Sequence, residues 1–127
     1  MPYAILGWTS LGLLALLILP FVLVRLNKWV LKTKSKPYQK LIRFLRMLHK
    51  PAGIALLLVA AVHGYLALGT LRLHTGTVLF AVVLLTAVLG GAFYRLKKKP
   101  LFSAHKLAAV LTVLVFLLHF FLPRLFN

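Results

Sequence analysis

Residues 51–71 read PAGIALLLVAAVHGYLALGTL, an uninterrupted run without Asp, Glu, Lys or Arg. A helix needs about 20 predominantly apolar residues to cross the hydrocarbon core of a bilayer. Three further stretches, residues 3–24, 75–94 and 101–122, are also predominantly apolar and long enough. The sequence therefore predicts an all-α integral membrane four-helix bundle, with residues 1–127 forming a single membrane domain.

The composition of the whole chain supports this assignment. Of its 127 residues 62% are hydrophobic, and 16 Lys and Arg stand against no Asp or Glu, which gives a formal net charge of +16. A typical globular protein is about 45–50% apolar, and a soluble fold this apolar would expose large apolar patches. A basic excess alone would fit nucleic-acid binding, but the apolar runs leave no soluble domain to carry such a surface. We expect the lipid bilayer as a partner, and no nucleic acid.

Residue types that are absent exclude several classes of chemistry. With no cysteine, the chain has no disulfide framework, no thiolate metal site and no covalent haem-attachment motif. With no carboxylate side chain, it lacks the groups for paired-carboxylate hydrolysis, carboxylate-ligated calcium and aspartyl phosphate chemistry. A small multidrug transporter of similar length would need an acidic residue in the membrane. Ionisable residues within the membrane are the default functional sites, and only histidine remains for that role.

The basic residues predict the orientation in the membrane. Fourteen of the 16 lie in residues 25–50, in residues 95–99 or at Lys106, whereas Arg72 and Arg124 lie at the opposite ends of the spans. By the positive-inside rule, the connection 25–50 is cytoplasmic and both termini face outside. We expect a multi-pass protein of the cell (plasma or inner) membrane. Within that connection, residues 37–48 (PYQKLIRFLRML) form either a surface helix on anionic lipid or an extension of the second span.

Four of the five histidines form a regular pattern. His49 and His63 stand at i and i+14 on the second span, and His105 and His119 repeat this spacing on the fourth. Such a step rises about 21 Å along a helix and returns to within about 40° of the same face. The second and fourth spans run in the same direction, so His49 is expected at the depth of His105 and His63 at the depth of His119.

Two facing imidazoles at each of two depths are what two stacked bis-histidine haems require, because each iron takes two neutral imidazoles as axial ligands. We therefore expect two haem b cofactors, with His49 and His105 on the inner iron and His63 and His119 on the outer iron. Two alternatives remain open: histidines that only pack between helices, and a transition-metal path, for which one depth offers only two ligands.

The segments HKPAGIALLLVAAVH (49–63) and HKLAAVLTVLVFLLH (105–119) resemble the histidine pattern of di-haem transmembrane cytochromes b. The pattern is similar to that of the cytochrome b subunit of quinol-oxidising complexes and of ferric-reductase-type transmembrane domains. This resemblance covers residues 49–122 and implies haem ligation without specifying a substrate. The chain departs from the larger relatives, since it has no additional quinone-site loops and no flavin or nicotinamide domain, and it contains no GxGxxG segment.

Other residues are candidates for supporting roles. Glycine allows helices to approach closely around a flat macrocycle or simply around each other, and the candidates are Gly53, Gly76 and Gly90. Basic side chains at the interfaces would either pair with haem propionates or set the membrane topology and contact lipid headgroups. The candidates are Lys50, Lys106, Arg46 and Lys97 for the inner haem and Arg72 and Arg124 for the outer one. His74 lies outside the paired pattern and is either a solvated loop residue or a group that meets a quinol, a propionate or an external acceptor.

These features predict electron transfer across the bilayer through two haems. The haems supply the redox chemistry, and the protein supplies ligation and spacing. The chain lacks a series of titratable groups through the membrane, so we expect no proton pumping. It would serve as a subunit that links a partner redox protein to quinone, or as a stand-alone quinone-linked oxidoreductase of ferric iron or superoxide. A haem-free assembly or transport subunit is the third alternative.

Overall fold

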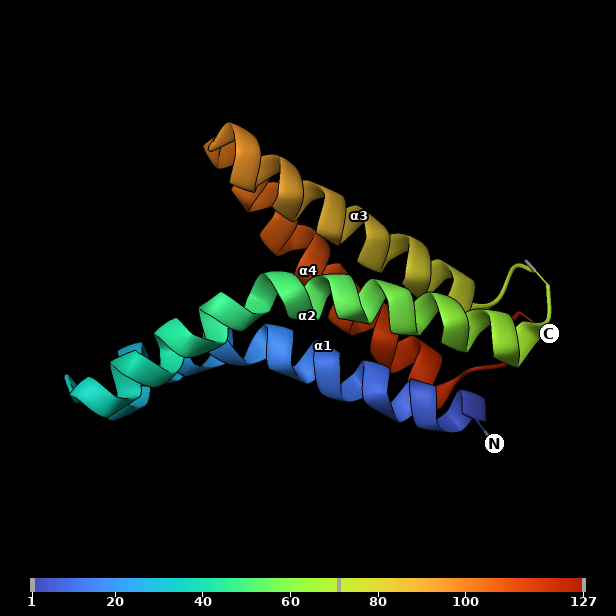
Figure 1. Cartoon of the computed structure of the whole chain (residues 1–127), viewed down its shortest axis with the longest axis horizontal. Coiled ribbons are helices and arrows are strands. Elements are labelled where there is room, and N and C mark those ends of the chain that lie inside the picture. Colours follow the sequence, from blue (N-terminus) through green and yellow to red (C-terminus); the bar gives the residue numbers. More distant parts are fainter. Residues whose placement is uncertain (1, 71, 127) are drawn as a thin grey trace. The chain divides into compact units, whose positions relative to one another are not determined.

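The computed structural model describes residues 2–70 and 72–126, and within them the chain is helical almost throughout. Its elements are α1 (Pro2–Leu26), the π-helical turn η1 (Asn27–Leu31), α2 (Lys36–Leu68), α3 (Thr75–Leu96) and α4 (Lys99–Phe121) (Figure 1). All four α-helices of these residues are long and apolar enough to cross a membrane. The prediction of an all-α chain with four potential spans is confirmed to that extent. Residues 1, 71 and 127, which bound the predicted domain and the second span, lie outside the described residues.

The second helix is longer than the predicted span. It begins at Lys36 rather than residue 51 and runs for 33 residues, which corresponds to about 50 Å at 1.5 Å per residue. The segment 37–48 is therefore part of α2. A hydrocarbon core of about 30 Å would accommodate only some 20 of these residues, so in a membrane the basic N-terminal part would extend beyond the span. The helix ends where Gly69 adopts a φ of 69°, and its amide donates to the Tyr65 carbonyl at 2.8 Å.

Four hydroxyl side chains of the candidate spans are bonded to their own helices. The Thr9 and Ser10 hydroxyls of α1 donate to the carbonyls four residues earlier at 2.8 and 2.9 Å, and the same bond is made by Thr86 in α3 and Thr112 in α4. Lipid offers no hydrogen-bond partner, so groups at membrane depth must be satisfied internally. Among the described residues, no buried side-chain nitrogen or oxygen lacks a partner.

Contacts divide the chain into two compact units, Met1–Val59 and Ala60–Asn127. In the first unit, the turn between α1 and α2 is fixed by its own side chains. The Asn27 side chain donates to the Thr33 carbonyl at 3.1 Å and accepts from the Thr33 amide at 2.8 Å. The Tyr38 hydroxyl donates to the Leu23 carbonyl. These bonds join the start of α2 to the end of α1.

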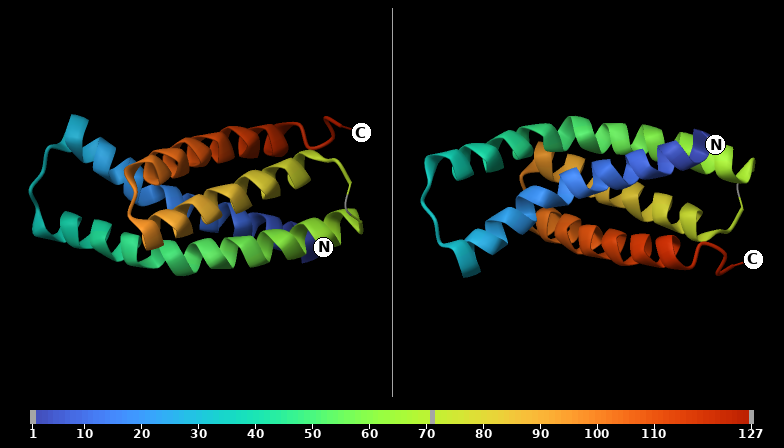
Figure 2. Two further views of the ribbon diagram at one scale, coloured as in Figure 1. Left: turned by 90° about the horizontal axis from the view of Figure 1, so that it is seen from above. Right: turned by 90° about the horizontal axis from the view of Figure 1, so that it is seen from below.

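In the second unit, α3 and α4 lie side by side along their length (Figure 2). The chain reverses at Lys97, whose φ is 56° and whose amide donates to the Phe93 carbonyl at 2.8 Å. The Phe93 and Phe102 rings pack 4.8 Å apart near this turn. Farther along the pair, the Thr86 and Thr112 hydroxyl oxygens lie 3.0 Å apart. This antiparallel hairpin is the part of the fold that positions the histidines of α4.

Candidate functional site

The two histidines of α4 are both half-buried, and each interacts with α3. His105 lies in the second turn of α4, and His119 lies in its last turn. No proline follows Pro100 within the helix, so uninterrupted helix separates the two imidazoles. Within the α3–α4 hairpin, the two imidazoles contact different groups of α3.

His105 is held by the backbone of α3. Its Nδ1 lies 2.8 Å from the Thr86 carbonyl oxygen, and a carbonyl only accepts, so Nδ1 carries the hydrogen and donates it. A Cβ added at Gly90 would lie 2.9 Å from both Nδ1 and Cε1 of the His105 ring. In an α-helix, the residue four positions after a carbonyl lies directly over it. The absence of a side chain at Gly90 is thus what lets the imidazole reach the Thr86 carbonyl.

His119 is held by a side chain of α3. Its Nδ1 lies 2.9 Å from the Thr75 hydroxyl oxygen, and the same hydroxyl donates to the Pro123 carbonyl at 3.0 Å. A threonine hydroxyl has one hydrogen, so it must accept from the imidazole, and Nδ1 is again the donor. Gly76 makes room here too, because a Cβ at that position would lie 3.1 Å from Cε1 of His119.

Both imidazoles therefore carry a hydrogen on Nδ1, and in the neutral form of such a ring the lone pair lies on Nε2. A histidine that ligates a metal through Nε2 typically donates its other N–H to a carbonyl or similar acceptor, and this bond fixes both tautomer and ring orientation. The donor chemistry of His105 and His119 fits the axial ligation of a haem iron. The described residues contain no group of three or more His, Cys, Asp or Glu that could hold a metal ion. A bis-histidine haem iron requires only two protein ligands, because the macrocycle supplies the others.

The histidines of α2 fall in different units. His63 belongs to the second unit and interacts electrostatically with His119, so these two members of the predicted outer pair lie in one another's vicinity. His49 belongs to the first unit and is half-buried on α2. Its pairing with His105, like the ligation of iron by either pair, stays a prediction.

His74 is the N-terminal cap of α3. Its Nδ1 accepts a hydrogen bond from the Gly76 amide at 3.2 Å, which is the bond that a capping Ser, Asp or Asn usually makes. The ring centroids of His74 and His119 are 6.1 Å apart with an interplanar angle of 77°. The sequence predicted that His74 is either a solvated loop residue or a group that meets a quinol, a propionate or an external acceptor. Neither prediction included a role as a helix cap.

The supporting residues differ in what they contact. A Cβ at Gly53 would meet only the Leu17 side chain at 4.0 Å, an ordinary contact in the first unit. Gly76 and Gly90 lie instead against histidine rings. The predicted propionate partners Lys50, Lys106, Arg72 and Arg124 are all exposed, and their assignment stays a prediction.

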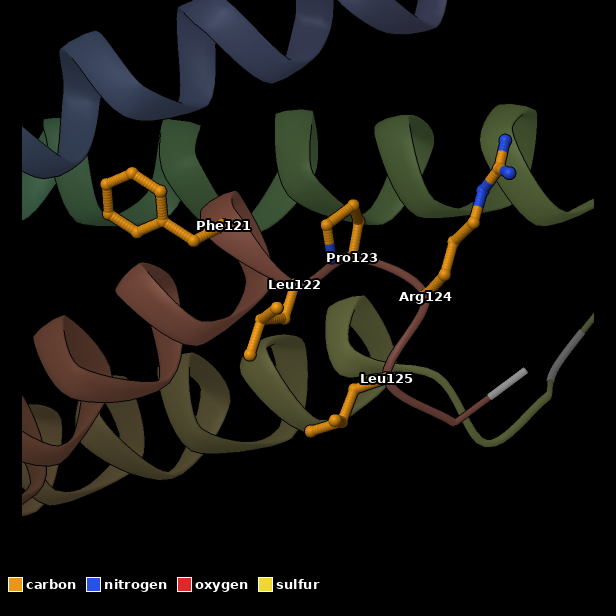
Figure 3. Close-up of a pocket in the computed structure, with 5 residues that line it drawn as sticks. All are labelled: Phe121, Leu122, Pro123, Arg124 and Leu125. Carbon is orange, nitrogen blue, oxygen red and sulfur yellow. The ribbon is translucent and has the colours of Figure 1, made fainter.

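Lys106 and Arg72 make local contacts with neighbouring side chains. The Lys106 ammonium lies 4.7 Å from the centroid of the Phe102 ring, and the Arg72 Nε donates to the Thr70 hydroxyl at 3.2 Å. Arg124 lies beyond the end of α4, where residues 121–125 line a hollow of about 300 Å³ (Figure 3). In that view Arg124 extends away from Leu122 and Leu125.

Sequence reasoning missed the two groups of α3 that hold the α4 histidines, the Thr75 hydroxyl and the Thr86 backbone carbonyl. Thr75 and Thr86 are among the few polar residues of the third span, and Thr75 directly precedes Gly76. A hydroxyl in an apolar span is a weak signal, however, because most such groups bond to their own helix.

Comparisons with protein-family models, curated proteins and solved structures found no match for the chain.

Proposed function

We propose that this protein carries electrons across a membrane by means of two b-type haems. His63 and His119 would be the axial ligands of one iron, and His49 and His105 those of the other. When bound, haem supplies reversible one-electron chemistry at iron. The chain supplies neutral imidazoles, keeps water out with apolar helices and spaces the two sites along α4.

The observation that carries the proposal is the pair of Nδ1 hydrogen bonds made by His105 and His119. In the neutral ring each bond leaves the lone pair on Nε2, and the two rings project from one helix about four turns apart. Glycine accompanies both rings at the same spacing, since Gly76 and Gly90 also stand at i and i+14 and each lies against one imidazole. A histidine that only fills space between helices would not require this repeated arrangement.

The direction and the partners of transfer belong to the same proposal. The basic extension of α2 and the basic α3–α4 turn would face the cytoplasm of a cell membrane, with both termini outside. A quinone or a partner redox protein would exchange electrons at one face. A stand-alone reaction with ferric iron or superoxide would be distinguished by activity of the isolated chain with quinol.

The test is a reduced-minus-oxidised visible spectrum of the detergent-purified chain from a haem-replete host, with haem and protein quantified in one sample. We expect about two haems per chain and a low-spin bis-histidine spectrum. His63→Ala and His119→Ala should each remove one haem and retain the other, and His49→Ala and His105→Ala should remove the second haem. His74→Ala is the matched control and should retain both. A wild-type chain without haem would overturn the proposal.

A further inference from the structure

Thr75 is the residue through which the hairpin holds His119. It is 0% exposed and stands at the first position of α3, directly after the His74 cap. Its hydroxyl contacts two groups that lie more than 40 residues later in the sequence. These are Nδ1 of His119, at 2.9 Å, and the Pro123 carbonyl, at 3.0 Å. A polar group so completely buried is costly unless its hydrogen-bonding capacity is used, and here both partners use it.

The direction of this chain of bonds follows from the three groups. The Pro123 carbonyl can only accept, so the single hydroxyl hydrogen of Thr75 is committed to it. The hydroxyl oxygen then accepts from Nδ1–H of His119. A hydroxyl that donates to a carbonyl becomes a better acceptor, because successive hydrogen bonds polarise one another. The His119 ring is thereby made more electron-rich at Nε2.

His105 is held at Nδ1 by a different kind of acceptor. This acceptor is the backbone carbonyl of Thr86, which no side-chain substitution removes. The two imidazoles of α4 thus have the same tautomer but differ in what maintains it.

We infer that Thr75 is a positioning residue for His119, which fixes the tautomer and orientation of this ligand and sets the reduction potential of one haem independently of the other. The inference rests on the proposed function. Stronger donation from the ligand stabilises the ferric form. Removal of the Thr75 hydroxyl should therefore raise the potential of the haem at His119 and leave the other potential in place.

The experiment compares Thr75→Val with Thr75→Ser in the haem-loaded chain. Thr112→Val is the matched control, because Thr112 is also buried, at 3% exposure. Its hydroxyl donates to the Ala108 carbonyl and lies 3.0 Å from the Thr86 hydroxyl, and it is not bonded to an imidazole. Redox titration gives both midpoint potentials, electron paramagnetic resonance reports the ferric ligand field, and transfer of haem to an apoprotein acceptor reports how tightly each haem is held.

We expect Thr75→Val to raise one midpoint potential, to shift one of the two ferric signals and to weaken binding of that haem by about 10- to 100-fold. Thr75→Ser should restore all three properties, and Thr112→Val should change none. If Thr75→Val does not fold, Thr75→Cys, which preserves volume and accepts hydrogen bonds weakly, should show the same changes in smaller measure.

The outcomes separate this inference from the proposed function. Suppose that the wild-type chain binds two haems, and that the midpoint potentials and the haem transfer are the same in Thr75→Val and Thr75→Cys as in the wild type. This result overturns the inference alone. Equal shifts of both potentials, or an equal effect of Thr112→Val, also overturn it, because they indicate a general loss of packing. A wild-type chain that binds no haem overturns the proposed function and the inference together.

Discussion

At the scale of single residues, the candidate site depends on side chains that are absent as much as on those present. The His105 ring occupies the space over Gly90, and the His119 ring lies against Gly76. Glycine within a helix costs about 0.5–1 kcal/mol relative to alanine. In this hairpin that cost is offset by hydrogen bonds that a methyl group would block. The glycines therefore act through the histidines of the neighbouring helix.

Two adjacent glycines of α3 test this explanation. In Gly90→Ala the new methyl would lie 2.9 Å from the His105 ring, so the ring must move and its bond to Thr86 must lengthen or break. We expect a loss of about 1–3 kcal/mol in the free energy of unfolding, typical of overpacking. Gly91 is the control, since a Cβ there meets nothing within 4 Å, and Gly91→Ala should stabilise the helix by about 0.5–1 kcal/mol. Denaturation in detergent, followed by circular dichroism, measures both; equal stability of the two variants would contradict the explanation.

At the scale of helices, the absence of Asp and Glu changes how the ends are formed. Acidic residues commonly stabilise the first turn of a helix by interacting with its dipole and free amides, but no helix here has one. At α4, Pro100 occupies the first turn, where its missing amide hydrogen costs nothing. At α3, a ring nitrogen of His74 takes the place of the usual oxygen. The composition thus gives a neutral imidazole a structural role at a helix end.

The cap of α3 gives a prediction at this scale. His74→Ala removes the acceptor for the Gly76 amide and should cost about 0.5–2 kcal/mol. His74→Asn supplies a side-chain oxygen and should restore most of that stability. Hydrogen exchange at the Gly76 amide is the direct measurement, with faster exchange expected in His74→Ala and near wild-type protection in His74→Asn. Unchanged protection in His74→Ala would mean that the ring nitrogen is not the cap.

At the scale of the whole molecule, the charge of the chain restricts how it would work. All 16 charged side chains are basic, so no carboxylate is present to pass protons through the membrane. In the four candidate spans histidine is the ionisable group suited to that task, and we have proposed these histidines as ligands of iron. Electron transfer by this chain should therefore move charge across the bilayer without compensating proton movement.

Vesicles that contain the purified protein test this prediction. With ferricyanide trapped inside and dithionite outside, we expect reduction of the internal ferricyanide, and we expect valinomycin with potassium to accelerate it by dissipating the membrane potential. A trapped pH dye should report no proton movement in step with electrons. Vesicles with His119→Ala are the control and should lose the transfer. Proton movement stoichiometric with electrons in the wild-type vesicles would refute the prediction.

The sequence predicted the helices because the requirement is local. A run of apolar residues without charge must satisfy its own backbone in lipid, and a helix does so within the segment itself. The limits of α3 and α4 came within two residues of the predicted spans. The start of α2 lies 15 residues before the start of the predicted span. Residues 36–50 mix basic and apolar residues, so a hydropathy criterion excludes them from the span although they are helical.

The histidine spacing, and with it the candidate ligands, was also determined by the sequence alone, because positions i and i+14 on a helix return to nearly the same face. Only the tertiary structure decided what holds these rings. The bonds from His105 to Thr86 and from His119 to Thr75 join residues 19 and 44 positions apart, and they depend on the rotation and register of α3 against α4. Side-chain packing over the glycines sets that register, and no local pattern in either helix specifies it.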